Sequence, residues 1–278
     1  MRVVTEDDIL AFAEALRRNE RSCATVEKYT RDTVTFMKYC KGRQVNGDMI
    51  RDYRMHLRER YAISSVNSMV TSLNAFFKFK GWHDIRVKQL KMQQDAFCRD
   101  EKDLSRQEYQ RLIEAAEAAK KYRLSLIIQT VCGTGIRISE LRFITYEAAK
   151  KGEALVNCKG KVRHVFIIKA LRSLLIKYAK KNGIKSGPIF ITRKGNPVDR
   201  SNIWRDMKTV CKAAHVSPQK VFPHNLRHLF AKTFYDIDKD IARLADVLGH
   251  SNINTTRIYT VTSIKEHGKK MERMKLVM

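Results

Sequence analysis

The segment Leu248-Gly249-His250-Ser251-Asn252-Ile253-Asn254-Thr255-Thr256-Arg257-Ile258-Tyr259 places a tyrosine nine residues after a histidine, near the end of a 278-residue chain. Three earlier segments carry further cations and histidines. They are Thr134-Gly135-Ile136-Arg137-Ile138-Ser139-Glu140-Leu141, Lys159-Gly160-Lys161 and His224-Asn225-Leu226-Arg227-His228. No ordinary packing rule predicts this order of residue types, so the four segments together indicate a chemical site.

These residue types can act jointly on a phosphodiester. Arginine clamps phosphate oxygens, a lysine ammonium can protonate a leaving oxygen, and a phenol becomes a nucleophile where a base or nearby cations favour its phenolate. The candidate catalytic residues, in chain order, are Arg137, Lys159, His224, Arg227, His250 and Tyr259. Lys161 is the alternative to Lys159 as the proton donor.

Each candidate taken singly also has a plain structural interpretation. Arg137 follows the uncharged segment 124–136, and Glu140 can be its partner in a structural ion pair. A lysine in a turn is usually only solvated, and a histidine after a helix-ending glycine is usually a cap. His228 is more typical of a packed or structural residue. The site prediction therefore depends on the joint order and spacing of the set.

The charge of the chain indicates a polyanionic partner. Lys and Arg number 55 against 29 Asp and Glu, a net of +26, which points to nucleic acid. A membrane surface is the competing polyanion, but the chain has no apolar run long enough to span one. Residues 124–136 predict a buried helix instead. The N-terminus lacks the apolar stretch of a signal peptide, so we expect a cytoplasmic protein bound to double-stranded DNA.

No motif for a cofactor or metal is present. The sequence contains neither a phosphate-binding glycine loop nor a dinucleotide fingerprint, and its six cysteines are scattered without a C-x-x-C pair. We expect reduced, mostly buried thiols, no cofactor and no metal.

Residues 1–95 predict a small helical domain with four amphipathic helices, because apolar residues recur at helical spacing. The four stripes are Ile9, Phe12, Ala13 and Leu16; Val26, Tyr29, Thr33, Phe36 and Cys40; Ile50, Tyr53, Leu57 and Tyr61; and Val66, Met69, Val70, Leu73, Phe76 and Phe77. The polar residues 96–103 are expected to form a linker, and 104–278 a second domain.

The second domain is predicted to be mainly helical with one small antiparallel sheet. Ser105 and Glu108 fit a capping box at its start. The β-rich runs 153–158 and 162–168 flank Lys159-Gly160-Lys161 and predict a hairpin, and 189–191 could add a strand. Apolar spacing predicts further helices over 171–178 and 203–211.

The motif set resembles the tyrosine recombinase (integrase) family over nearly the whole chain. Arg137 lies in the family's T-G-x-R-x-x-E-L pattern, His224 and Arg227 form its H-x-x-R box, His250 its L-G-H histidine, and Tyr259 its nucleophile. The separation of 26 residues between the two histidines is also typical. The resemblance implies a helical core-binding domain followed by an α+β catalytic domain.

The resemblance further implies a clamp around duplex DNA in which Tyr259 forms a 3′-phosphotyrosyl link. Arg137 and Arg227 would bind the non-bridging oxygens, Lys159 would protonate the 5′ oxygen, His224 would assist proton transfer at the tyrosine, and His250 would hydrogen-bond the phosphate. Four protomers would exchange strands and pass the helical segment after Tyr259 to a neighbour. The alternative for this segment is a frayed basic tail in solvent. Integration, excision, inversion and resolution are all compatible outcomes.

Two other functions fit parts of the pattern. A type IB topoisomerase uses the same chemistry but reseals its own strand as a monomer. A DNA-binding regulator could use the same fold without catalysis. Joining of two different duplexes distinguishes a recombinase from a topoisomerase. Covalent trapping on DNA distinguishes either enzyme from a non-catalytic regulator.

Overall fold

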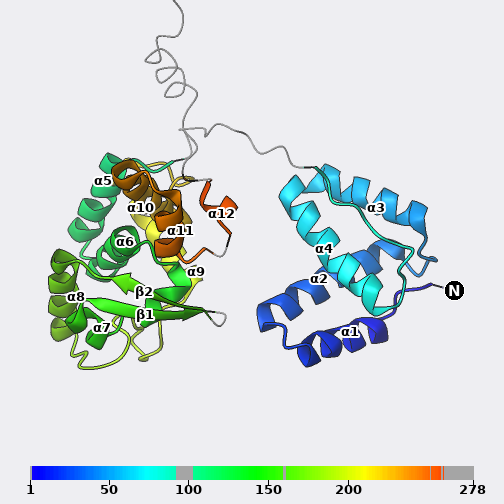
Figure 1. Cartoon of the computed structure of the whole chain (residues 1–278), viewed down its shortest axis with the longest axis horizontal. Helices are drawn as coiled ribbons and strands as arrows, with labels where there is room; N and C mark the ends of the chain where they lie inside the picture. Colours follow the sequence, from blue (N-terminus) through cyan, green and yellow to red (C-terminus); the bar gives the residue numbers. More distant parts are fainter. Residues whose placement is uncertain (1, 92–102, 159–160, 251, 258, 260–278) are drawn as a thin grey trace, which may run out of the picture. The chain divides into compact units, whose positions relative to one another are not determined.

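The chain divides into two compact units, Met1–Gln94 and Asp95–Met278 (Figure 1). The computed structural model describes residues 2–91, 103–158, 161–250, 252–257 and 259. Of the predicted linker 96–103, only Asp103 lies within these ranges. Across the same ranges, no helix combines the length and apolarity needed to cross a membrane.

The first unit contains the four expected helices. They are α1 (Glu6–Arg18), α2 (Cys23–Cys40), α3 (Gly47–Arg60) and α4 (Ile63–Phe79). Thr5 caps α1 in a capping box with Asp8, which satisfies two backbone N–H groups at the helix start. The predicted stripes supply the core, in which Phe12 meets the ring of Phe76 edge-on at 5.3 Å. Tyr61 is an exception, because it follows α3 and is 47% exposed.

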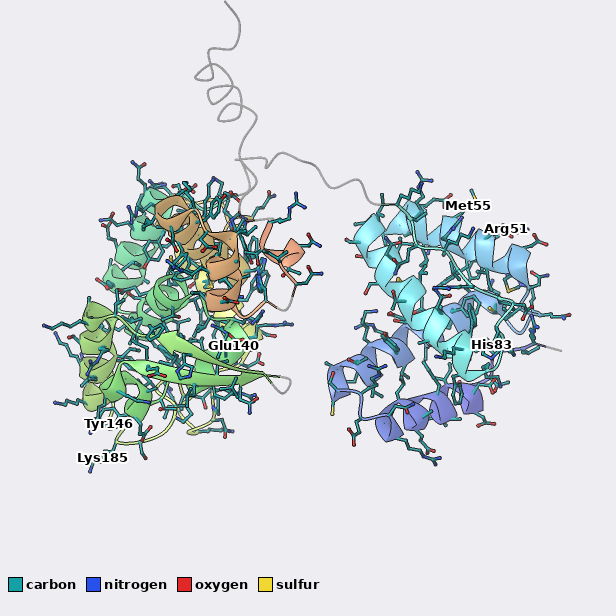
Figure 2. The ribbon with its side chains drawn as sticks, viewed as in Figure 1. Arg51, Met55, His83, Glu140, Tyr146 and Lys185 are labelled. Atoms are coloured by element: carbon teal, nitrogen blue, oxygen red, sulfur yellow. The ribbon has the colours of Figure 1, made fainter. Side chains whose placement is uncertain are left out.

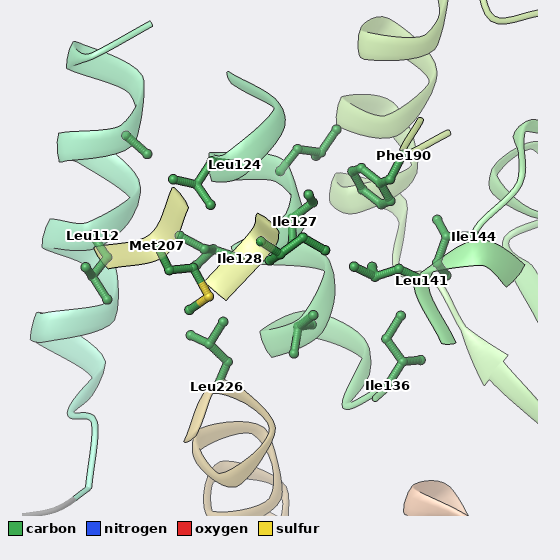
Figure 3. Packing of buried hydrophobic residues seen from close by; sticks show 14 of the residues in the cluster. Leu112, Leu124, Ile127, Ile128, Ile136, Leu141, Ile144, Phe190, Met207 and Leu226 are labelled. Atoms are coloured by element: carbon green, nitrogen blue, oxygen red, sulfur yellow. The ribbon is translucent and has the colours of Figure 1, made fainter. Parts of the chain in front are cut away.

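The second unit is built around one buried helix. Its helices are α5 (Arg106–Ala118), α6 (Tyr122–Thr134), the 3-10 helix η2 (Ile138–Phe143), α7 (Tyr146–Lys151), α8 (Lys169–Lys181), α9 (Arg200–Val210), α10 (Pro223–Asp238), α11 (Ile241–Leu248) and α12 (Asn254–Arg257). Helix α6, which carries no charge from Leu124 onward, packs against α5, α8, α9 and α10. Figure 3 shows Ile127 and Ile128 of α6 among Leu112, Met207 and Leu226. The prediction of a buried helix is thereby confirmed for residues 124–134, and the helix ends there because Gly135 is its left-handed C-cap.

The predicted hairpin is present as strands β1 (Glu153–Cys158) and β2 (Lys161–Phe166). They pair antiparallel, with Glu153 opposite Phe166 and Cys158 opposite Lys161. Lys161 therefore belongs to β2 and not to the turn, which corrects the sequence prediction. Lys159 and Gly160, which connect the strands, lie outside the described residues.

The additional strand predicted over 189–191 is wrong for the described residues, since the sheet has two strands. Only two isolated bridges form there, Thr145 with Pro188 and Ile191 with Pro197. Both bridges involve a proline, which has no N–H to donate and cannot extend a ladder. Ile189 and Phe190 are buried in the core instead.

Candidate functional site

Arg137 is placed by the turn that ends α6. Gly135 adopts the left-handed conformation (φ 64°) at the C-cap, and the Phe230 ring occupies the space that a Cβ would need. The backbone then extends at Arg137 and enters η2. The Glu140 carboxylate accepts the Arg137 backbone N–H at 2.7 Å and Nη1 at 2.9 Å. The sequence-predicted ion pair is confirmed, and the Arg137 side chain remains 40% exposed.

Glu140 is a buried anion held in its charged form. It is 1% exposed and is labelled in Figure 2. Burial opposes its ionisation, but the Arg137 N–H and the charges of Arg163 and Arg137 outweigh burial and lower the pKa of Glu140 below its usual value. Arg163 is therefore a second cation beside the predicted Arg137–Glu140 pair.

Arg227 lies at the first turns of α10, which begins at Pro223. Its guanidinium is 2% exposed and donates to the Gly135 carbonyl at 2.5 Å and the Leu248 carbonyl at 2.7 Å. These carbonyls are at the C-terminal ends of α6 and α11, where helix dipoles favour a cation. Burial, and then the charge of Arg137, lowers the pKa of Arg227 to about 10, so it stays charged at neutral pH.

The tautomer of His250 follows from its two partners. Nε2 lies 3.0 Å from Arg227 Nη2, and Nδ1 lies 2.8 Å from Thr256 Oγ1. Because a guanidinium can only donate, Nε2 must accept, and Nδ1 carries the proton that Thr256 receives. Burial, and then the charges of Arg227 and Arg137, lowers the pKa of His250 to about 4. His250 is therefore neutral at pH 7.

Tyr259 is 3% exposed and lies among three imidazoles. Its ring stacks on His250 at 6.0 Å, meets His228 edge-on at 4.9 Å, and is 6.4 Å from His224. Burial, and then the charge of Arg227, lowers the pKa of His224. The imidazole of His224 is thus a neutral proton acceptor near the phenol.

Five of the six candidate residues are brought together by these contacts. His224, Arg227, His250 and Tyr259 come from α10 and the segment after α11, and they are joined by one hydrogen bond and two ring contacts. Arg137, at the start of η2, reaches the same segment through the Gly249 carbonyl, which lies 3.5 Å from its Nη2. The sixth, Lys159, lies outside the described residues. The described ranges contain no group of side chains suited to hold a metal ion.

A basic groove of about 770 Å³ adjoins this cluster. Its lining includes four arginines and one indole: Ile136, Arg137, Ile138, Ser139, Arg200, Ser201, Trp204, Arg205, Phe222, Pro223, His224 and Arg227. Trp204 is 49% exposed. Such a groove suits an anionic ligand that carries flat apolar groups, as a nucleic acid does.

The sequence prediction missed Arg163 and the partner of His228. Arg163 lies two residues before the buried Val165 on β2, so strand alternation places an arginine on the inner face of the sheet. That alternation was the available signal. His228 was expected to be packed or structural. Its Nδ1 lies 3.5 Å from Asp103 and its ring contacts Tyr259.

Comparison with known proteins defines the class. The model of the phage integrase family matches residues 102–266, more than half of the chain. The chain therefore belongs to the phage integrase family and is a tyrosine recombinase.

Individual relatives agree with this placement. The chain is similar to the tyrosine recombinase XerA of Thermococcus kodakarensis, at 29% identity over 276 residues that cover 96% of this chain and 94% of the relative. It is also similar to XerH of Campylobacter jejuni, at 34% identity over 167 residues that cover 56% of this chain and 47% of the relative.

Solved structures share the fold. The XerH recombinase in a pre-cleavage complex with its difH substrate has a TM-score of 0.70 at 16% identity, and covers 96% of this chain and 89% of its own. A lambda integrase dimer bound to a COC′ core site has a TM-score of 0.72 at 16% identity, and covers 92% and 94%. A lambda integrase tetramer bound to a Holliday junction has a TM-score of 0.71 at 17% identity, and covers 92% and 77%. The mainly helical architecture with a small antiparallel sheet is thereby confirmed.

Proposed function

We propose that this protein recombines duplex DNA at a specific site through a 3′-phosphotyrosyl intermediate. The observation that carries the proposal is the convergence of two arginines, two neutral histidines and a tyrosine beside one basic groove. In that setting Arg137 and Arg227 hold the non-bridging oxygens of the scissile phosphate and stabilise the charge of the transition state. A type IB topoisomerase uses the same chemistry but rejoins the cut end to its own strand, whereas a recombinase joins it to a second duplex.

The chemical step balances as a transesterification. Tyr259 Oη bonds to phosphorus while the bond from phosphorus to the 5′ oxygen breaks. The phenolic proton passes to His224, which the lowered pKa leaves unprotonated at neutral pH. Lys159 gives a proton to the departing 5′ oxygen. The 5′-hydroxyl of a partner strand then attacks the phosphotyrosine and reverses the step.

His250 is assigned a positioning role in this proposal. With Nε2 bonded to Arg227 and Nδ1 to Thr256, it links the phosphate-binding guanidinium to the segment that carries Tyr259. A direct bond from His250 to phosphate, as the family resemblance implies, would require a proton on Nε2 and loss of the Arg227 contact.

Assembly into a tetramer through exchanged C-terminal segments is the second part of the proposal. Residues 260–278 lie outside the described residues, but their sequence places Ile264, Met271 and Met274 among basic side chains. An apolar groove of about 280 Å³ on the second unit suits such a segment from another copy. Its lining is Arg106, Tyr109, Cys132, Leu229, Phe230, Thr233, Phe234 and Ile237. We also propose a cytoplasmic location, where the DNA substrate is found.

Covalent trapping on DNA of random sequence tests the proposal and identifies the target at the same time. Purified protein is incubated with a random-sequence duplex library that carries nicks, and adducts that survive detergent are isolated and sequenced. The expected result is an enriched duplex attached through its 3′ phosphate to Tyr259, as shown by mass spectrometry after nuclease digestion. Mixing two enriched duplexes of different length should then yield hybrid products.

Three outcomes would contradict parts of the proposal. Absence of any adduct would favour a non-catalytic DNA-binding protein. Adducts with relaxation of supercoils but no hybrid duplexes would favour a topoisomerase. Attachment to a tyrosine other than Tyr259 would overturn the site.

A further inference from the structure

Arg163 connects three separate elements near the site. Its side chain is 12% exposed, and Nη2 donates to Glu140 Oε2 at 2.6 Å. Nη1 donates to the Val247 carbonyl at 2.9 Å. The other oxygen of Glu140 binds Arg137. One guanidinium thus joins β2 to η2 and to the end of α11.

The same side chain packs on the turn that precedes His250. Gly249 is left-handed (φ 65°), and the Arg163 side chain occupies the space where a Cβ would stand. The Gly249 carbonyl in turn lies 3.5 Å from Arg137 Nη2. Arg163 therefore packs on the backbone of this turn, and Arg137 reaches the same turn through the Gly249 carbonyl.

We propose that Arg163 is a positioning residue that holds the β1–β2 hairpin in register with the phosphate-binding residues. The inference rests on the proposed function. Lys159 follows β1 directly in sequence, and β2 begins two residues later. Within the described part of the hairpin, Arg163 is the residue that bonds to both η2 and α11. Releasing it would free the hairpin to shift relative to Arg137.

A small shift matters because proton transfer is sensitive to distance. The ammonium must come within about 2.6–3.2 Å of the 5′ oxygen, and a displacement of about 1 Å can cost on the order of a hundredfold in rate. Loss of Arg163 should consequently resemble loss of the lysine. Binding of DNA should change little, since Arg163 is buried and bonded within the protein.

A sulfur substitution at the leaving position separates this role from a general defect. A thiolate leaves from phosphorus without needing a proton, so cleavage of a 5′-bridging phosphorothiolate does not depend on the lysine. Single-turnover cleavage is measured on the trapped duplex with oxygen or sulfur at that position, together with the dissociation constant. The variants are Arg163→Ala, Lys159→Ala and Arg172→Ala.

Arg172 is a matched control. It also donates to backbone carbonyls, those of Ala149 and Lys150, but it contacts neither Glu140 nor the Gly249 turn. Arg163→Ala should cleave the oxygen substrate about tenfold or more slowly than wild type. Its cleavage rate on the sulfur substrate should lie within about threefold of the wild-type rate. Arg172→Ala should resemble wild type on both substrates.

Other outcomes overturn the inference. Equal slowing of Arg163→Ala on both substrates would place the defect elsewhere than the proton donor. If Arg163→Ala cleaves the oxygen substrate at the wild-type rate, the position of the hairpin does not depend on the Arg163 bonds. If Arg163→Ala does not fold, Arg163→Lys is used, because it retains the charge but cannot make both hydrogen bonds. It must cleave the oxygen substrate more slowly than wild type, though less slowly than expected for Arg163→Ala, and the sulfur substrate must restore its rate. Failure of the wild type to cleave would instead refute the proposed function.

Discussion

At the scale of single residues, the site is a set of cations and neutral imidazoles arranged around a buried phenol. Arg227 and His250 share a hydrogen bond, and His250 stacks on Tyr259. A lone His or Tyr in this sequence has little diagnostic value, and only order and spacing identified the set. Arg163 could not be found in that way, because its partners Glu140 and Val247 are distant from it in sequence.

Replacing Tyr259 with phenylalanine should abolish the covalent adduct and preserve DNA binding. The change removes one hydroxyl and leaves the ring contacts with His228 and His250 in place. Denaturing gels of protein mixed with the trapped duplex measure the adduct, and mobility shifts measure binding. An adduct formed by Tyr259→Phe would exclude Tyr259 as the nucleophile.

The two lysines of the hairpin should differ in their effect on cleavage. We expect Lys159→Ala to slow the reaction on the order of a hundredfold or more, as loss of a general acid does. Lys161→Ala should have a much smaller effect, because Lys161 begins β2. Single-turnover rates on the oxygen and sulfur substrates decide between them. If the sulfur substrate restores cleavage by Lys161→Ala but not by Lys159→Ala, then Lys161 is the proton donor and Lys159 is not.

The neutral histidines predict a pH dependence of stability. An unfolded histidine has a pKa of about 6.5, whereas the pKa of folded His250 is about 4. Between these values the unfolded chain takes up the proton first, so the free energy of unfolding should fall as the pH drops from 6.5 towards 4. His224, whose pKa is also lowered, acts in the same direction.

Urea unfolding at about pH 7.5 and about pH 5 tests this linkage. The loss of stability on acidification should be smaller in His250→Gln than in the wild type. An equal or larger loss in the variant would mean that His250 does not remain neutral in the folded protein.

At the scale of elements, the sequence predicted what local spacing and caps determine. The stripes of the first unit apart from Tyr61, the capping box at Ser105 and the hairpin are present in the structure, although the second strand ends at Phe166 and not at residue 168. Prediction failed where long-range backbone pairing decides the outcome. Residues 189–191 have strand composition, yet proline on the bridging positions prevents a ladder. Which face each helix presents to the site likewise depends on packing around α6.

The proposed exchange of C-terminal segments predicts the same defect for two variants. Truncation after Thr262 removes the donated segment, and Ile237→Asp places a charge in the proposed receiving groove. Ile237 is 83% exposed, so its replacement should not disturb folding. Both variants should bind a half-site normally and form fewer tetramers on paired sites, as measured by light scattering.

A surface substitution elsewhere controls for the added charge. Ile253 is also exposed, at 45%, and does not line the groove. Ile253→Asp should assemble like the wild type. Normal tetramer yield from the truncated protein would show that the segment has no role in assembly.

At the scale of the whole molecule, positive charge is spread over both units but is not equal between them. Residues 1–95 carry 18 basic and 12 acidic side chains, a net of +6, and residues 96–278 carry 37 and 17, a net of +20. Each unit can therefore contribute phosphate contacts, with the larger contribution expected from the unit that holds the candidate site.

DNA binding should weaken steeply with salt. A protein that makes about 6–10 phosphate contacts loses roughly a thousandfold or more in affinity between about 50 and 200 mM salt. Titrations of the trapped duplex at several salt concentrations give the slope of log affinity against log salt. A nearly flat plot would be inconsistent with a protein that grips duplex DNA over both units.

The contact between Arg163 and Gly249 also bears on how this sequence can diverge. A side chain at position 249 would collide with Arg163, and a left-handed backbone there disfavours most residues in any case. Substitutions at the two positions are consequently not independent in evolution. Position 163 must shorten before position 249 can gain a side chain, and asparagine or aspartate would be the first residues accepted. A side chain gained at position 249 while Arg163 is still present would meet both the collision and the backbone strain, so that order of substitutions should be disfavoured.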